Sequence, residues 1–262
     1  MNLDLTGKNA LVCGSTQGIG KASAMELAAL GANVTLLARN EESLNTVVKE
    51  LPNMGNQKHH CIVADYATPD YLKVILHHYQ ESNPPFHILV NNTGGPKGGK
   101  IIKADSSEFL SAFSNHLICN HILVQALVEG MKSEGYGRII NIISTSVKIP
   151  LANLGVSNTI RGAVANWSKT LANELGKFGI TVNNVLPGAT LTGRLETIID
   201  NKSKASGKPI EEIEEEMKSE IPLHRFAKPE EIANAVAFLA SPAAAYINGI
   251  NVPVDGGRTG NL

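Results

Sequence analysis

Short apolar, β-branched runs alternate with longer segments of helical period along the chain, and this alternation constrains the fold more than any other feature. Strands that alternate with helices are typical of βαβ units and a parallel sheet. Runs this short and this apolar indicate strands that helices cover on both faces. We predict seven strands, near Asn9–Cys13, Asn33–Ala38, His60–Ala64, Ile88–Asn91, Arg138–Ile143, Thr181–Leu186 and Ile250–Val254.

The segments between these runs have the spacing of helices that pack on a sheet. No linker rich in proline, glycine or serine divides the 262 residues, and α/β chains of this length commonly form one unit. We therefore predict an α/β fold over residues 1–262, a single-domain Rossmann fold with a doubly wound, seven-stranded parallel sheet flanked by helices. The predicted helices include Gly20–Leu30, Glu41–Leu51, Pro69–Glu81, Ser106–Glu134, Gly162–Phe178 and Pro229–Ala240.

Residues 190–220 break the alternation with a mixed stretch that ends in an acidic run over residues 210–217. An insertion of this length is often a lid over a site. We predict a substrate-side lid there, and we interpret the acidic run as the solvated face of a helix.

Composition narrows the classes of partner. The formal net charge of −1 provides no field that would draw the protein onto nucleic acid or an anionic membrane. No apolar run approaches the roughly 20 residues of a membrane span, and the chain start has no signal-peptide core. The three scattered cysteines suit a reducing compartment and lack metal-ligand spacing. We expect a cytoplasmic protein with a small-molecule partner, no nucleic acid, no membrane and no metal.

A glycine-rich turn follows the first predicted strand and precedes a helix, with the sequence Gly14-Ser15-Thr16-Gln17-Gly18-Ile19-Gly20. Glycines let the backbone turn tightly and approach a pyrophosphate, which free N–H groups and the positive end of the helix stabilise. A purely structural turn would show the same glycines. The position after the first strand of an α/β chain favours a dinucleotide site formed by these seven residues.

The second predicted strand ends at Ala38-Arg39-Asn40, where dinucleotide folds read the adenosine ribose. An acidic residue there would bind the 2′-hydroxyl of NAD and repel a 2′-phosphate, whereas an arginine can pair with that phosphate. Arg39 therefore favours NADP(H). The alternative interpretation is a strand-end arginine exposed to water.

The glycine spacing resembles that of the short-chain dehydrogenase/reductase family, and further matches follow in order along nearly the whole chain. The resemblance implies an acid at the adenine, an Asn-Asn-Thr-Gly strand end, and a segment that holds the nicotinamide carboxamide. It also implies a catalytic asparagine on the long helix and a substrate-orienting serine after the fifth strand. The residues concerned are Asp65, Asn91, Gly94, Pro187, Gly188 and Thr192 for the cofactor, and Asn115 and Ser144 for catalysis.

The same resemblance implies properties of the whole protein. Family members have the strand order 3-2-1-4-5-6-7, are commonly tetramers, and transfer a hydride to or from alcohols and carbonyls. This chain is most similar in appearance to 3-oxoacyl-carrier-protein reductases. We therefore expect a homotetramer that uses NADP(H) on a carbonyl or alcohol substrate.

The chain departs from the family at the Tyr-x-x-x-Lys pair, because Ser157 and Arg161 stand at those positions. An alkyl hydroxyl is a far weaker acid than a phenol, whose pKa is near 10. Arginine stays protonated and cannot act as a general base, but its planar fork can hold an oxyanion, a carboxylate or a cofactor hydroxyl.

Two interpretations of this variant site follow. In one, Ser144, Ser157 and Arg161 form an oxyanion-hole-like cluster, and water relayed past Asn115 supplies the proton. In the other, the protein binds a dinucleotide without turnover, as a sensor or scaffold.

Other charged and titratable residues bear on the same site. Arg161 could clamp an acidic substrate group, with Lys97, Lys100 and Lys148 in loops that we expect to face the pocket. We interpret His116 as a core or interface histidine that reaches the site only if its helix turns that way.

Overall fold

Seven parallel strands form one sheet in the order β3-β2-β1-β4-β5-β6-β7, as predicted. The computed structural model describes residues 1–261, so residue 262 of the predicted domain lies outside the described residues. The order reverses direction between β1 and β4, the switch point at which such sheets bind ligands. The strands are β1 (Asn9–Cys13), β2 (Asn33–Ala38), β3 (His60–Val63), β4 (Ile88–Asn91), β5 (Gly137–Ile142), β6 (Ile180–Pro187) and β7 (Asn251–Val254).

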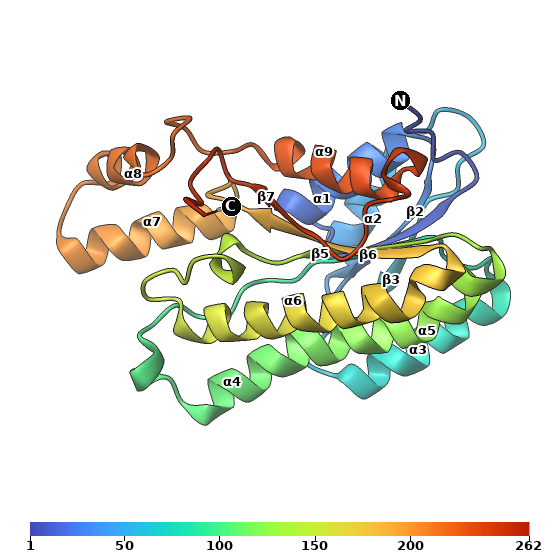
Figure 1. Ribbon diagram of the computed structural model, residues 1–262, viewed down its shortest axis with the longest axis horizontal. Helices are drawn as coiled ribbons and strands as arrows, with labels where there is room; N and C mark the ends of the chain where they lie inside the picture. The colour runs from blue at the N-terminus through green and yellow to red at the C-terminus, as the bar shows by residue number, and fades with distance from the viewer. Residues whose placement is uncertain (262) are drawn as a thin grey trace.

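Helices cover both faces of the sheet (Figure 1). The α-helices are α1 (Gly18–Ala29), α2 (Glu41–Glu50), α3 (Pro69–Ser82), α4 (Ser106–Phe113), α5 (Cys119–Ser133), α6 (Gly155–Leu175), α7 (Gly193–Ser206), α8 (Ile210–Ser219) and α9 (Pro229–Ala240). Short 3-10 turns are η1 (Ile101–Lys103), η3 (Thr145–Val147), η4 (Gly176–Phe178) and η5 (Pro242–Ala244), and η2 (Ser114–Ile118) is a π-helical turn.

The alternation of side chains along the strands builds two cores. Val12 of β1 packs in a cluster with Leu27 of α1 and residues of α2 and α9. Its neighbour Leu11 packs on the opposite face, with Leu123 of α5 and residues of α3 and α6. Both faces of the strand are therefore buried, which explains the nearly continuous apolar runs in the sequence.

The helix expected over Ser106–Glu134 runs without a break to Ser133, but it contains η2, a π turn that adds a residue to the turn and changes which side chains face inward. One predicted helix start was wrong. The helix expected from Gly162 begins at Gly155, and its buried residues Val156 and Ile160 continue the helical spacing upstream. Gly162, which lies within the helical pattern, concealed the true start of the helix at Gly155.

A row of four asparagines crosses the sheet in register, from β4 to β7. Asn91 Nδ2 donates to Asn141 Oδ1 at 2.8 Å, Asn141 Nδ2 to Asn184 Oδ1 at 2.9 Å, and Asn184 Nδ2 to Asn251 Oδ1 at 2.8 Å. Asn141 also donates to the hydroxyl of Ser168 on α6 at 3.2 Å. This asparagine row favours one strand register, because a slip by one residue would break every bond in it.

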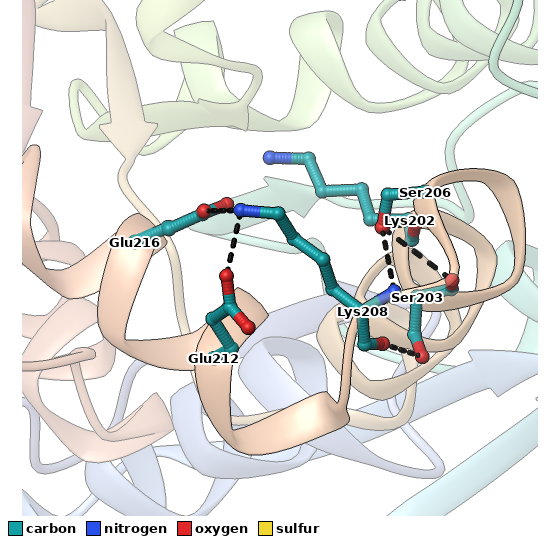
Figure 2. Close-up of polar contacts among 6 residues, drawn as sticks. All are labelled: Lys202, Ser203, Ser206, Lys208, Glu212 and Glu216. Carbon is teal, nitrogen blue, oxygen red and sulfur yellow. Dashed lines mark hydrogen bonds and ion pairs between the residues drawn. The ribbon is translucent and has the colours of Figure 1, made fainter.

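The segment predicted as a lid forms α7 and α8, which extend past the end of the sheet (Figure 1). Their apolar faces form a small separate cluster that includes Leu195, Ile213 and Met217. Figure 2 shows the corner between the helices, where Lys208 Nζ contacts the carboxylates of Glu212, at 2.7 Å, and Glu216. The two glutamates are exposed, so the acidic run is a solvated helix face here.

Within residues 1–261, no helix is both long enough and apolar enough to cross a membrane.

Candidate active site

The glycine turn lies at the carboxyl end of β1 and is closed by side-chain and backbone contacts. Gly14 has a φ of +56°, and a Cβ on Gly20 would lie 2.2 Å from the Gly14 carbonyl oxygen, so only glycine fits at position 20. Asn92 Nδ2 donates to the carbonyl oxygens of Cys13, at 3.3 Å, and Gly14, at 3.1 Å. The turn is thus held by the end of β4.

The start of α1 has the properties of an anion site. Gln17, its N-cap residue, is exposed and provides no side-chain cap, so the first backbone N–H groups are available to a ligand. Thr16 is half-buried, whereas Ser15 is fully buried against Leu37 of β2. Ile19 packs against the core and anchors the helix. Such a cradle fits a pyrophosphate.

The segment after β6 reaches this turn. Gly188 N donates to the Val254 carbonyl of β7 at 2.9 Å, just after Pro187 ends β6. Thr192 Cγ2 lies 3.1 Å from the position of a Cβ on Gly18. The structure therefore brings Pro187, Gly188 and Thr192 to the same edge of the sheet as the glycine turn.

Arg39 and Asp65 line one hollow of about 480 Å³ beyond the ends of β2 and β3. Arg39 is exposed and forms no ion pair within the described chain. Asp65 accepts a hydrogen bond from the backbone N–H of Ala67 at 3.0 Å. The hollow joins the two residues predicted to contact the adenosine half of a dinucleotide.

The two predicted residues at the end of β4 have different surroundings. Asn91 is 1% exposed, and its side chain belongs to the asparagine row, so Asn92 is the residue whose side chain contacts the glycine turn. Gly94 is exposed and has open space beside its Cα.

Ser144 follows the carboxyl end of β5, and Arg161 of α6 contacts the last residue of that strand. The Ser144 hydroxyl accepts a hydrogen bond from the N–H of Ser146 at 3.1 Å and caps η3. Ser157 and Arg161 lie one turn apart on the same side of α6. Arg161 is 8% exposed, and its Nη1 donates to the Ile142 carbonyl at 2.8 Å.

His116, the neighbour of the predicted Asn115, lies close enough to Arg161 for the guanidinium charge to act on its ring. His116 is 3% exposed. Burial, and to a smaller extent the charge of Arg161, lowers the pKa of His116 to about 3, although a hydrogen bond to the Gly94 backbone raises it in part. The ring is therefore neutral near pH 7. Asn115 is half-buried in η2. The π turn, which the helical pattern did not reveal, places His116 inward.

Arg194, at the start of α7, is a second site residue that the sequence analysis missed. A Cβ on Gly95 would lie within 4 Å of the guanidinium groups of both Arg194 and Arg161. The pKa of Arg161 falls to about 10, mainly by burial and also by the charge of Arg194, which leaves Arg161 protonated at neutral pH. The sequence signal that could have identified Arg194 is its position two residues after Thr192.

The three lysines expected to face the pocket differ in exposure. Lys97 and Lys100 are exposed, and Lys148 is half-buried after η3. The cation that the structure places beside Arg161 is the arginine of α7.

Comparisons with known proteins identify the family of this chain. A family model described as enoyl-(acyl carrier protein) reductase matches residues 14–259. The 7alpha-hydroxysteroid dehydrogenase of Escherichia coli K12 is 32% identical over 261 residues, covering 100% of this chain and 98% of that protein. A 3-oxoacyl-[acyl-carrier-protein] reductase of Pseudomonas aeruginosa is 32% identical over 97% of this chain and 98% of its own length.

Among solved structures, the L-sorbose reductase of Gluconobacter frateurii, complexed with NADPH and L-sorbose, superposes with a TM-score of 0.93 at 32% identity over 100% of both chains. The family model and these relatives span almost all of the chain. The chain therefore belongs to the short-chain dehydrogenase/reductase family of oxidoreductases.

Proposed function

We propose that the protein is an NADP(H)-dependent oxidoreductase that transfers a hydride between the cofactor and a small carbonyl or alcohol substrate, through a Ser/Arg variant of the family's site. The observation that carries this proposal is the buried, protonated Arg161 beside Ser157, at the sheet edge where the glycine turn and Thr192 meet.

NADP(H) would supply or accept the hydride. The residues that would hold its phosphates are Gly14 through Gly20, with Thr192 closing over Gly18. Arg39, exposed in the hollow it shares with Asp65, would pair with the 2′-phosphate. The NADPH-bound L-sorbose reductase supports this choice of cofactor.

The chain's own contribution in the reducing direction would be charge stabilisation. Arg161 and the hydroxyls of Ser144 and Ser157 would stabilise the alkoxide oxygen, and a preorganised donor of this kind contributes about 3 kcal/mol to lowering a barrier. The neutral ring of His116 is a poor acid at pH 7, so the proton on the product hydroxyl would come from water.

We further propose a homotetramer located in the cytoplasm, on the likeness to the family alone. A light-scattering mass of the purified protein checks the tetramer.

The second candidate function is a sensor or scaffold that binds the dinucleotide without turnover. The observation that favours it is the presence of Ser157 and Arg161 where the family uses tyrosine and lysine.

NADPH oxidation tests the proposal. Purified protein is mixed with keto acids, 3-oxoacyl thioesters, aldehydes and sugars, while NADPH affinity is titrated in parallel. Turnover that Arg161→Ala abolishes without loss of NADPH affinity supports the enzyme. Tight NADPH binding with no turnover on any substrate supports the sensor, and no NADPH binding contradicts both.

A further inference from the structure

Two guanidinium groups from separate elements converge beside Gly95. A Cβ on Gly95 would lie 3.6 Å from Nη2 and 3.8 Å from Nε of Arg194, and 3.9 Å from Nη2 of Arg161. Arg161 comes from α6 and Arg194 from the start of α7. Like charges held this close repel one another, so an anion between them would stabilise the pair.

The described part of the chain does not neutralise either arginine. Its ion pairs join other residues, and neither Arg161 nor Arg194 contacts a carboxylate there. Each guanidinium donates to one backbone carbonyl at 2.8 Å, Arg161 to Ile142 and Arg194 to Pro96. The Nε of Arg161, within a side chain that is 8% exposed, has no partner in residues 1–261. A buried donor of this kind calls for an acceptor from a ligand.

The helix that carries Arg194 adds to the positive potential. Thr192, its N-cap residue, donates its hydroxyl to the Thr190 carbonyl at 3.2 Å and does not cap the helix. The N-terminal end of a helix carries a partial positive charge, which makes a first-turn arginine unfavourable for the helix itself. An anion bound here would offset that cost.

We infer that Arg161 and Arg194 form a clamp for the carboxylate of the substrate, and that the substrates are 2-oxo acids and the corresponding 2-hydroxy acids. The inference rests on the proposed function. A planar guanidinium fork matches a carboxylate with two parallel hydrogen bonds. In a 2-oxo acid the carboxylate adjoins the reacting carbonyl, so Arg161 can contact both groups. A phosphate of NADP(H) offers similar chemistry, and the experiment separates the two.

The test is a calorimetric titration that involves no turnover. Protein saturated with NADP⁺ is titrated with 2-oxo acids of increasing chain length and with their uncharged methyl esters, and NADP⁺ affinity is measured separately. We expect the best acid to bind at least about ten-fold more tightly than its ester. Arg194→Leu should abolish this preference and change the Kd of NADP⁺ by less than about two-fold.

Two variants control the result. Arg194→Lys keeps the positive charge but lacks the planar guanidinium fork, so it should keep only part of the preference for the acid over its ester. Lys202→Leu removes an exposed cation from a position further along α7 and should leave the preference unchanged. Because Arg194 is exposed, its replacement by leucine preserves the folded core.

Two results would overturn the clamp: no acid preferred over its ester, or a preference that survives Arg194→Leu. If the surviving preference came with weakened NADP⁺ binding, Arg194 would be assigned to a cofactor phosphate. Failure of the unmodified protein to bind NADP⁺ would instead overturn the proposed function, and the clamp with it.

Discussion

The asparagine row of the sheet and the arginine pair of the candidate site are both polar and both partly buried, but they are satisfied differently. In the row, Asn141 and Asn184 bond to neighbours on both sides within the protein. In the pair, Arg161 uses one backbone acceptor, leaves its Nε without a partner in the described chain, and faces a second cation. The row serves the fold, whereas the pair costs the fold free energy and is explained by a ligand.

The largest effect should follow from removal of the buried cation. Arg161→Met keeps an unbranched chain of similar length and removes the charge. We expect kcat/KM for NADPH-dependent reduction to fall about 100-fold or more, because a preorganised donor at a developing oxyanion is lost. Steady-state kinetics check this, and a fall of less than about three-fold would place Arg161 outside the reaction.

The next largest effect should be on stability, at the centre of the asparagine row. Asn141→Ala leaves Asn91 Nδ2 and Asn184 Oδ1 without their partners, and a buried unsatisfied group costs about 1–3 kcal/mol. We expect the free energy of unfolding in urea to fall by about 3 kcal/mol.

The matched control for this change is Asn251→Ala at the half-buried end of the row. It removes one bond only and should cost about 1 kcal/mol. Equal losses in the two variants would contradict the view that the row acts through its buried centre.

The pH dependence of stability should report the buried ring beside Arg161. The pKa of His116 is about 3 in the folded protein and 6.5 ordinarily, so the unfolded chain binds more protons between these pH values. The His116 contribution is therefore present above pH 6.5 and is lost as the pH falls towards 3, with a limiting slope of about 1.4 kcal/mol per pH unit.

His116→Gln should flatten this slope, as urea unfolding between pH 4 and pH 7 would show. Burial also lowers the pKa values of His59 and His87, but both remain in the variant, so the difference isolates His116. Identical slopes would mean that the ring is protonated or exposed in the folded protein.

The smallest effect should come from the exposed corner between α7 and α8. Lys208→Ala removes contacts to Glu212 and Glu216, and exposed ion pairs contribute little in water. Tm should change by less than about 2 °C in a thermal scan. A larger loss would show that the corner is part of the cooperative core.

Much of the fold was predictable because its signals are local. The apolar runs predicted both ends of each of the seven strands to within two residues, and the glycine turn marked the end of β1. The start of α6 was missed because a glycine interrupts the helical pattern of apolar residues. The π turn was missed because one added residue hardly changes the spacing of the apolar residues along the helix.

The candidate site was predictable only in part. The resemblance to the family identified Ser157 and Arg161, but the convergence of His116 and Arg194 on Arg161 joins three distant segments. Such contacts depend on how η2, α6 and α7 pack together, and no local pattern in the sequence reports that packing.

The most direct test of the contrast between row and pair is the free energy of unfolding of Arg161→Met without any ligand, measured beside Asn141→Ala. If Arg161 is held for a ligand, Arg161→Met should unfold within about 1 kcal/mol of the unmodified protein, or be more stable, because removing a buried charge offsets the lost bond to Ile142. A loss of about 3 kcal/mol, equal to that expected for Asn141→Ala, would contradict the account and make Arg161 a residue of the fold.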